Sequence, residues 1–243
     1  MSEKSNYNLF EIEWFSEFLG AFTTSDVLHP TVAQIEAYRG KLPDYLLQFW
    51  MDHGWCSWSN GQYWLCDPAL AKPVIDYVFM GDPDLDPEKM FAFGYTAFGE
   101  IDIWYGDATI RLNLLMDKVR VEPRYFNEEH QRFQTDKMMI GSSVAGRVSP
   151  AIAPWEDPNY NNMMPQALER LGRLQWGEIY GFVPALSMGG QNSVDNLQKV
   201  RMVEHLVFLA SLEPPTLYDY IPPADGEGGF GTVIPGRKIG SQE

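Results

Sequence analysis

Helical spacing of apolar residues marks the first part of the chain. Residues 9–22 place apolar side chains every three or four positions, which predicts an amphipathic helix. Thr31 and Gln34 have the spacing of a capping box, which predicts the start of a short second helix. Pro43 suits the first turn of a third helix, and Gly54 suits its C-terminal stop. We therefore expect three helices before the first strands.

The next segment, WCSWSNGQYW, predicts an aromatic β-hairpin. Asn60-Gly61 is the strongest short signal for a hairpin turn, and a turn there pairs Trp58 with Tyr63. Successive side chains of a strand point to opposite faces, so the aromatic residues are shared between the two faces. Either both faces are buried, or one face exposes aromatic area that suits a protein interface.

The two cysteines, Cys56 and Cys66, flank this turn. In the expected register their sulfurs point to opposite sides of the hairpin, which disfavours a disulfide between them. Cys56 lies among tryptophans, where a thiol stays protonated and inert. Neither cysteine has a CxxC or HxxxH companion, and the histidines lack partners at ligand spacing. We therefore expect no metal site and no cofactor.

Alternation of apolar and polar positions predicts an antiparallel sheet in the middle of the chain. The residues of one strand divide between two faces: Ile101, Ile103 and Tyr105 on one, and Glu100, Asp102 and Trp104 on the other. Before this sheet, Asp67-Pro68 predicts the start of a helix. Residues 81–89 then form an acidic loop that prolines interrupt.

The second half has a less regular pattern. Residues 125–162 have no clear period, and we place the domain junction there. A short helix is expected over 165–171, and a short strand is expected to end at Pro184. Apolar residues at helical spacing then predict one long helix over 192–212.

These elements predict an α+β fold of two small domains. Residues 1–122 would form an antiparallel sheet with packed helices, and residues 123–221 a helix-rich domain with short strands. Residues 222–243, rich in glycine and proline, would form a flexible tail. A chain of 243 residues is long enough for this arrangement.

The charge balance is the most informative bulk property. The chain has 33 acidic and 18 basic residues, for a net charge of −15. Such a surface repels nucleic-acid phosphates and speeds the capture of a basic partner, although acidic surfaces also serve solubility alone. No apolar run approaches the ~20 residues that span a bilayer, and the N-terminus lacks the pattern of a signal peptide. We therefore expect a cytoplasmic protein without direct contact to nucleic acid or membrane.

Carboxylates are the remaining candidates for chemistry. Glu100 and Glu178 lie beside glycines and aromatic residues, which can raise a carboxyl pKa. Alternatively, Glu178 binds backbone amides or an arginine such as Arg173, and we favour this interpretation. The chain has no G-x-S-x-G elbow, no P-loop and no dinucleotide fingerprint, so Gly189-Gly190 predicts a turn.

Two stretches of the chain resemble known families. LPDYLLQFWMDHGWCSWSNGQYWLCDP, followed by TAFGEIDIW, resembles the GAD-like domain of bacterial proteins. LGRLQWGEIYGFVPALSMGG, with VEHLVFLASL, resembles the C-terminal domain in the immunity proteins of type VI secretion DNase effectors. The resemblance covers residues 9–120 and 145–215 and keeps the order of the two domains in that family.

The resemblance implies a protein that is not an enzyme. Family members bind a cognate nuclease effector inside the producing cell, so the partner would be a basic protein. The residues expected to contact it are Asp82, Asp84, Asp86, Glu88, Glu178 and Tyr180. The motif residues expected to shape the scaffold are Asn60, Gly61, Gly181, Pro184, Gly189, Gly190 and His205. Glu178 and His205 would hold this backbone by hydrogen bonds.

Two alternatives stay open. The chain could be a small-molecule sensor or an enzyme that uses Glu178 in a glycine-lined pocket. It could also be a structural adaptor that pairs with itself through the aromatic hairpin.

Overall fold

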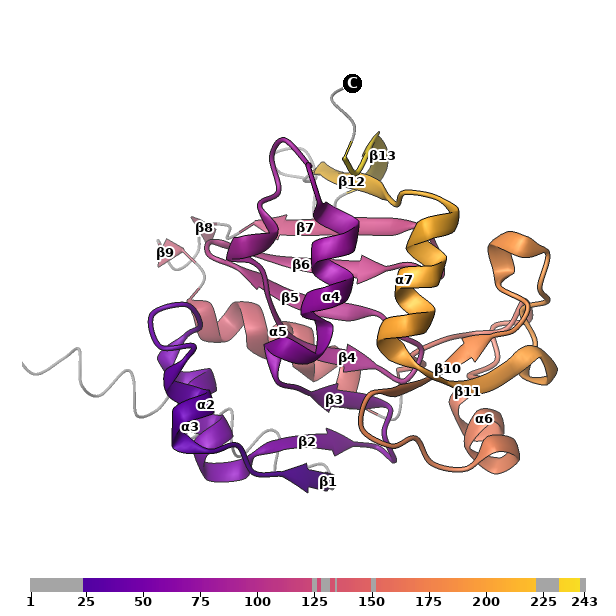
Figure 1. The fold of residues 1–243 in the computed structure, drawn as a ribbon, viewed down its shortest axis with the longest axis horizontal. Helices are drawn as coiled ribbons and strands as arrows, with labels where there is room; N and C mark the ends of the chain where they lie inside the picture. The colour runs from indigo at the N-terminus through magenta and orange to yellow at the C-terminus, as the bar shows by residue number, and fades with distance from the viewer. Residues whose placement is uncertain are drawn as a thin grey trace, which may run out of the picture.

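The chain forms a large mixed sheet with helices on both faces, which confirms an α+β fold (Figure 1). The computed structural model describes residues 24–123, 126–127, 132–133, 135–149, 152–221 and 232–240. The helix expected over 9–22 lies outside these residues.

Nine strands form the main sheet. In spatial order they are β1 (Thr24–Leu28), β2 (Trp55–Trp58), β3 (Tyr63–Leu65), β4 (Phe91–Thr96), β5 (Ile101–Tyr105), β6 (Ala108–Asn113), β7 (Lys118–Pro123), β12 (Thr216–Ile221) and β13 (Thr232–Lys238). Neighbouring strands are antiparallel except β7 and β12, which are parallel. Two small sheets lie apart from it: β8 (Phe126–Asn127) with β9 (Arg132–Phe133), and β10 (Glu178–Phe182) with β11 (Leu197–Arg201).

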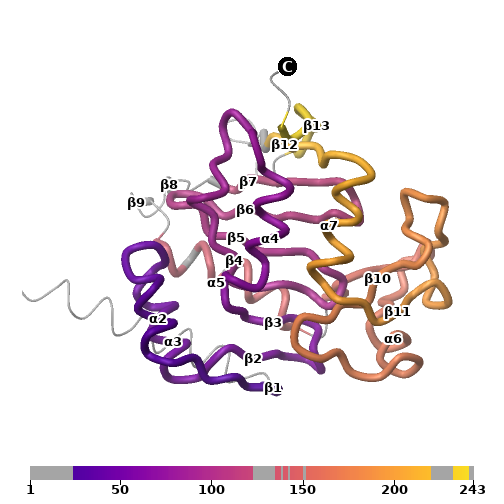
Figure 2. The backbone as a smooth tube through the Cα atoms, in the orientation of Figure 1, coloured from indigo at the N-terminus to yellow at the C-terminus, as the bar shows by residue number. Residues whose placement is uncertain are grey.

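Helices cover both faces of the main sheet (Figures 1 and 2). α4 (Pro68–Phe79) and α7 (Met202–Leu212) lie side by side on one face. α3 (Asp44–His53) and α5 (Asp136–Val148) pack against the other face. The shorter helical elements are α2 (Val32–Glu36), α6 (Met164–Leu171), η1 (Pro87–Lys89), η2 (Leu186–Met188) and η3 (Val194–Asn196).

Two helix starts agree with the sequence signals. Thr31 and Gln34 form the capping box that begins α2. The Asp67 carboxylate accepts a hydrogen bond from the amide of Ala69 and caps α4. The alternation along β5 is also confirmed, because Ile101 lies in the core beneath α4 and α7, whereas Trp104 lies in the core on the opposite face.

The aromatic hairpin is buried on both faces. β2 and β3 pair in the expected register, with Trp58 opposite Tyr63. Trp64 packs in the core beneath α4, whereas Trp58 and Tyr63 pack in the core beneath α3 and α5. An exposed aromatic face is therefore wrong for these residues, because helices cover both sides of the hairpin.

The cysteines follow the expected division between faces. Cys56 and Cys66 are free, buried thiols in the two opposite cores. Burial raises the pKa of Cys56 to about 12 and also raises the pKa of Cys66 above its ordinary value. Both thiols are therefore protonated at neutral pH.

The hairpin turn holds the C-terminal end of α5. Ser59 and Asn60 adopt positive φ in this turn, as does Gly61. Ser59 Oγ donates to the carbonyl of Val148 at 2.6 Å. Gln62 Nε2 lies within hydrogen-bond distance of three carbonyls, those of Arg147 (2.9 Å), Ser149 (2.9 Å) and Ile152 (3.0 Å). Because the last carbonyls of a helix lack partners within it, these contacts anchor α5 on the sheet.

One element of the second half differs from its prediction. Residues 197–201 form β11 and residues 202–212 form α7, where the apolar spacing predicted one long helix over 192–212. β11 pairs with β10 along all five of its residues, and this pairing satisfies backbone groups that a helix would have satisfied internally. The expected helix over 165–171 and the strand that ends before Pro184 are confirmed.

The expectation of two small, separate domains is corrected by the sheet. β12 from the second half pairs with β7 from the first, with Leu217 opposite Val119. The amide of Tyr180 donates to the carbonyl of Ala97 at 2.8 Å, and one core contains residues of both halves. Residues 232–238, within the expected tail 222–243, form β13 of the same sheet. The open edge of β7 explains this result, because β12 pairs with its otherwise unpaired backbone groups.

Gly94 on β4 provides a test of how closely the side chains pack on the main sheet. The side chain of Tyr63 occupies the space that a Cβ at Gly94 would need. A Cβ at Gly94 would lie 2.1 Å from Tyr63 Oη and 2.8 Å from the carbonyl oxygen of Trp64. We expect Gly94→Ala to lower the free energy of unfolding in denaturant by about 2–3 kcal/mol. The control is Gly146→Ala on α5, whose Cβ would meet nothing within 4 Å and should cost nothing. Equal stabilities for the two variants would contradict this account.

Candidate functional site

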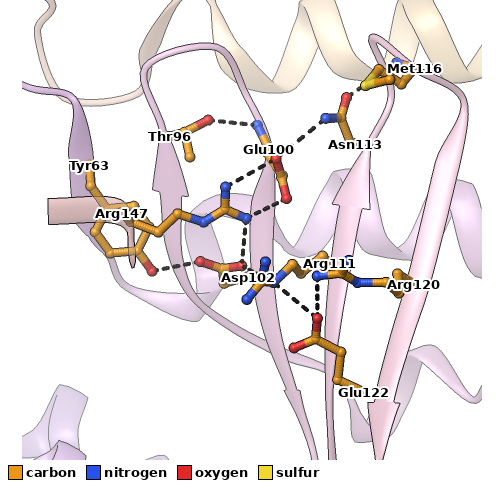
Figure 3. A network of polar contacts seen from close by, with 10 residues as sticks. All are labelled: Tyr63, Thr96, Glu100, Asp102, Arg111, Asn113, Met116, Arg120, Glu122 and Arg147. Carbon is orange, nitrogen blue, oxygen red and sulfur yellow. Dashed lines mark hydrogen bonds and ion pairs between the residues drawn. The ribbon is translucent and has the colours of Figure 1, made fainter. Parts of the chain in front are cut away.

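A row of charged side chains crosses the sheet on the face that α5 covers (Figure 3). Asp102 on β5 lies opposite Arg111 on β6, which lies opposite Arg120 on β7. Tyr63 Oη donates to Asp102 Oδ2 at 3.0 Å. Arg111 and Arg120 both pair with Glu122, and Arg111 Nε lies 3.5 Å from its carboxylate. The network therefore links four strands of the sheet.

Arg147 from α5 joins this network between two buried acids. Its Nη1 donates to Glu100 Oε2 at 3.2 Å, and its Nη2 donates to Glu100 Oε1. The same Nη2 lies 3.4 Å from Asp102 Oδ1. The Asp102 side chain is 1% exposed, so its charge depends on protein partners instead of water.

The pKa values of the two acids, Asp102 and Glu100, shift in opposite directions from their ordinary values. Burial raises the pKa of Asp102, and the nearby Arg147 and Arg111 offset this only in part. Burial also acts on Glu100, but the charge and hydrogen bonds of Arg147 outweigh it and lower the pKa of Glu100. A raised pKa, which the glycine and aromatic neighbours of Glu100 allowed, is therefore wrong for this residue. Because the guanidinium of Arg147 on α5 contacts both carboxylates, the network joins α5 to the sheet.

Glu178 holds a local turn. Its Oε2 accepts a hydrogen bond from the amide of Gln175 at 2.8 Å, which confirms the favoured interpretation of this residue. Arg173 pairs with Asp26 at 2.7 Å instead. Tyr180 is buried, and its hydroxyl donates to the carbonyl of Gly172 at 2.7 Å. Burial raises the pKa of Tyr180 to about 12.

The remaining motif residues lie where backbone and side chains approach closely. A Cβ at Gly181 would lie 2.7 Å from His205 Nε2, and a Cβ at Gly190 would lie 2.0 Å from the carbonyl oxygen of Pro184. Gly189 ends η2 with a φ of 84°. His205 Nε2 is buried without a hydrogen-bond partner among the described residues, and burial lowers the pKa of His205. The hydrogen bond expected from His205 is therefore not seen in this part of the chain.

The acidic side chains of the loop 81–89 differ in their exposure to solvent and therefore to a partner. The Asp82 side chain is fully buried and accepts hydrogen bonds from Arg237 at 2.6 and 2.8 Å and from the amide of Gly240 at 2.8 Å. The other three acids each face a base: Asp84 with Arg237, Asp86 with Lys89, and Glu88 with Lys72. The loop therefore holds β13, and its surface charge comes mainly from Asp84 and Glu88, which are 70% and 79% exposed.

The sequence interpretation missed the two arginines that organise these clusters. Arg147 lies 47 residues from Glu100 along the chain, and Arg237 lies 155 residues from Asp82. Both arginines occur in segments without a clear period, so no local signal marked their partners. The alternation that buries Asp102 did contain a signal, because a buried acid requires a base nearby.

Within the described part of the chain, no three His, Cys, Asp or Glu side chains are grouped to bind a metal ion. No helix in that part has the length and apolar character needed to cross a membrane.

Two family models match the chain, one on each side of α5. Residues 13–116 match the GAD-like domain. Residues 152–213, which include α6, β10, β11 and α7, match the C-terminal domain of T6SS immunity protein Tdi1. The chain therefore combines a GAD-like domain with a Tdi1 C-terminal domain. This result confirms both resemblances and their order.

A solved structure shares the whole arrangement of the GAD-like and Tdi1 C-terminal segments. The crystal structure of Atu4351 from Agrobacterium tumefaciens superposes with a TM-score of 0.77 at 27% sequence identity, covering 94% of this chain and 99% of that chain. No curated protein matches the chain. The Tdi1 C-terminal match suggests neutralisation of a cognate effector.

Removal of Arg147 tests the buried network. We expect Arg147→Met to lower the free energy of unfolding by about 3–5 kcal/mol at pH 7, because Glu100 and Asp102 would keep buried charges without their shared base. The deficit should shrink towards pH 4, where protonation removes those charges. Arg39→Met, which breaks an exposed pair with Glu36, should change stability by about 1 kcal/mol at most. If the two variants lose the same free energy of unfolding, the buried network stabilises the fold no more than an exposed ion pair does.

Asp82 gives a prediction for acid unfolding. Burial opposes its ionisation, but the hydrogen bonds from Arg237 and three backbone amides lower its pKa from 3.8 to about 2. A carboxyl with a depressed folded pKa stabilises the fold above its unfolded pKa and loses this contribution as pH falls towards the folded pKa. We expect urea unfolding to show Asp82→Asn about 2 kcal/mol less stable than the unchanged chain at pH 7, and the difference to vanish near pH 2.

Glu88→Gln is the matched control for Asp82→Asn, because Glu88 belongs to the same loop and is 79% exposed. This substitution should leave stability almost unchanged at both pH values. If the stability difference between Asp82→Asn and the unchanged chain does not vary with pH, the lowered pKa of Asp82 does not stabilise the fold.

Proposed function

We propose that this chain binds a basic nuclease effector of a type VI secretion system in the cytoplasm and stops it from cleaving DNA. The observation that carries the proposal is the Tdi1 C-terminal match over 152–213 next to a GAD-like domain. The net charge of −15 supports a basic partner, because a nuclease presents cations to DNA phosphates.

Only part of the negative charge can act on a partner. Glu100 and Asp102 are buried against Arg147, and Arg111 lies 3.9 Å from Asp102, so the charge of the two acids is balanced inside the protein. The attraction must come from exposed acids such as Asp84 and Glu88 and from the surplus of acids over bases. This attraction acts over the Debye length, about 8 Å at physiological salt, and therefore speeds the encounter more than it fixes the docked position.

A small-molecule sensor or enzyme is the second candidate. One observation favours it: a small pocket whose lining includes His205, together with Leu114, Leu115, Phe182, Ala185, Leu186, Ser187 and Leu209. Most of this lining is aliphatic, and Glu178 does not belong to it. The carboxylate of Glu178 is already held by the amide of Gln175, so we prefer the binding function.

The proposal is tested by measuring DNA cleavage with purified components. The product of any nuclease gene found beside the gene for this chain serves as the effector, and it is incubated with plasmid DNA and increasing amounts of the full chain. We expect cleavage to stop near an equimolar ratio, and we expect the rate of complex formation to fall as salt rises, because salt screens the attraction between opposite charges.

An unrelated protein of similar size and net charge is the control, and it should leave cleavage unchanged. If the effector cleaves DNA equally fast with an excess of this chain, the chain does not neutralise it. If the control protein inhibits equally well, charge alone explains the effect and the proposed specific binding is wrong.

A further inference from the structure

Two loops form one lobe beside the main sheet, at the end of the molecule where β10 and β11 lie (Figures 1 and 2). We call residues 155–163 and 183–196 together the lobe. Trp155 Nε1 donates to Asn192 Oδ1 at 2.9 Å, and Asn192 Nδ2 donates to the carbonyl of Glu156 at 3.0 Å. These contacts hold the two loops together.

The lobe exposes large apolar side chains. Tyr160 is 84% exposed, more than any other large hydrophobic side chain in the described part of the chain. Met188 on the second loop is 59% exposed, and Val183 is 40% exposed. Large exposed apolar side chains are typical of protein interaction sites, and both loops of the lobe carry them.

Hydrogen bonds order the backbone of the first loop around Tyr160. The φ of Tyr160 is 62°, a conformation that bulky residues rarely adopt. The Asp157 carboxylate accepts hydrogen bonds from the amides of Asn159 at 2.8 Å and Asn161 at 2.9 Å. The Asp157 amide donates to the carbonyl of Asn161 at 3.0 Å, which closes the turn. The ring of Tyr160 is therefore presented by an ordered turn.

The second loop is held by its own hydrogen bonds. Asn196 Nδ2 donates to the carbonyls of Pro184 at 2.9 Å and Gln191 at 3.1 Å. The amides of Met188 and Gly190 both donate to the carbonyl of Ala185, at 3.0 and 2.9 Å. A surface that is ordered before binding loses less conformational entropy in a complex.

The lobe is acidic, which favours a basic partner. Its two loops contain Glu156, Asp157 and Asp195 but no lysine or arginine. Arg170 on α6 pairs with Asp195 at 3.1 Å, whereas Glu156 and Asp157 have no ion pair with the described residues. Apolar anchors with an acidic rim complement an apolar hollow bordered by lysine or arginine. A second copy of this chain would bring acids against acids, so the charge favours a basic protein.

We propose that the lobe is the docking surface for a basic protein, with Tyr160 and Met188 as its apolar anchors. Glu156 and Asp157 then face cations of that protein. The inference rests on the proposed function, which makes the partner the nuclease effector. It adds the surface through which the chain holds that effector, a surface that includes neither Tyr180 nor the acids of the loop 81–89.

The test measures the dissociation constant of the full chain for the purified effector by calorimetry. Tyr160→Asn removes the ring, and asparagine adopts positive φ more easily than tyrosine, so the variant should fold at least as stably. We expect its dissociation constant to rise about 10-fold or more, as for a central aromatic anchor. Met188→Ser should also weaken binding, whereas Met80→Ser, at a methionine that is 73% exposed beyond α4, should leave it unchanged.

Each outcome decides one point. If the unchanged chain binds the effector and both lobe variants bind within about twofold of it, the lobe is not the docking surface, while the proposed function stands. If the unchanged chain does not bind the effector, the inference and the proposed function are both wrong. If sedimentation shows that the chain alone forms a dimer that Tyr160→Asn dissociates, a second copy occupies the lobe and the proposed partner is wrong.

Discussion

The parallel pairing of β12 with β7 is the contact on which the rest of the structure depends. Parallel neighbours cannot be joined by a tight turn, so the chain must return across a face of the sheet. That return contains α6, β10, β11 and α7, and therefore the whole segment that matches the Tdi1 C-terminal domain. α7 lies beside α4, and the amide of Tyr180 in β10 donates to Ala97 at the end of β4. The lobe that follows β10 is thus positioned by the sheet, and a partner would meet it as part of one body.

The other face of the sheet depends on a balance of charges. Asp102 is buried, and its charge is tolerated because Arg147 of α5 and the hydroxyl of Tyr63 both reach it. The hairpin turn, through Ser59 and Gln62, holds the end of the same helix. The segment between the two family matches is therefore a layer of the fold. The same balance separates the acids that stabilise the protein from the exposed acids that can attract a partner.

Sequence patterns predicted the elements that depend on interactions between residues close together in the chain. The register at Trp58 and Tyr63 follows from the turn residues between them, and the start of α2 follows from the capping box at Thr31. Contacts between distant residues could not be read in this way. Residues 197–201 have helical spacing, but pairing with β10 makes them a strand. Arg237, the partner of Asp82, lies 155 residues away in the chain. Nothing in the sequence around Tyr160 indicates that its side chain is exposed.

Hydroxyl-radical footprinting tests the central claim, that a lobe held by the continuous sheet is the surface a partner meets. The method reports the solvent exposure of methionine and tyrosine side chains with and without the effector. The account predicts that oxidation of Tyr160 and Met188 falls strongly in the complex, whereas oxidation of Tyr77 and Met80, at the far end of α4, stays the same. Protection of Tyr77 and Met80 with unchanged oxidation of Tyr160 and Met188 would contradict it.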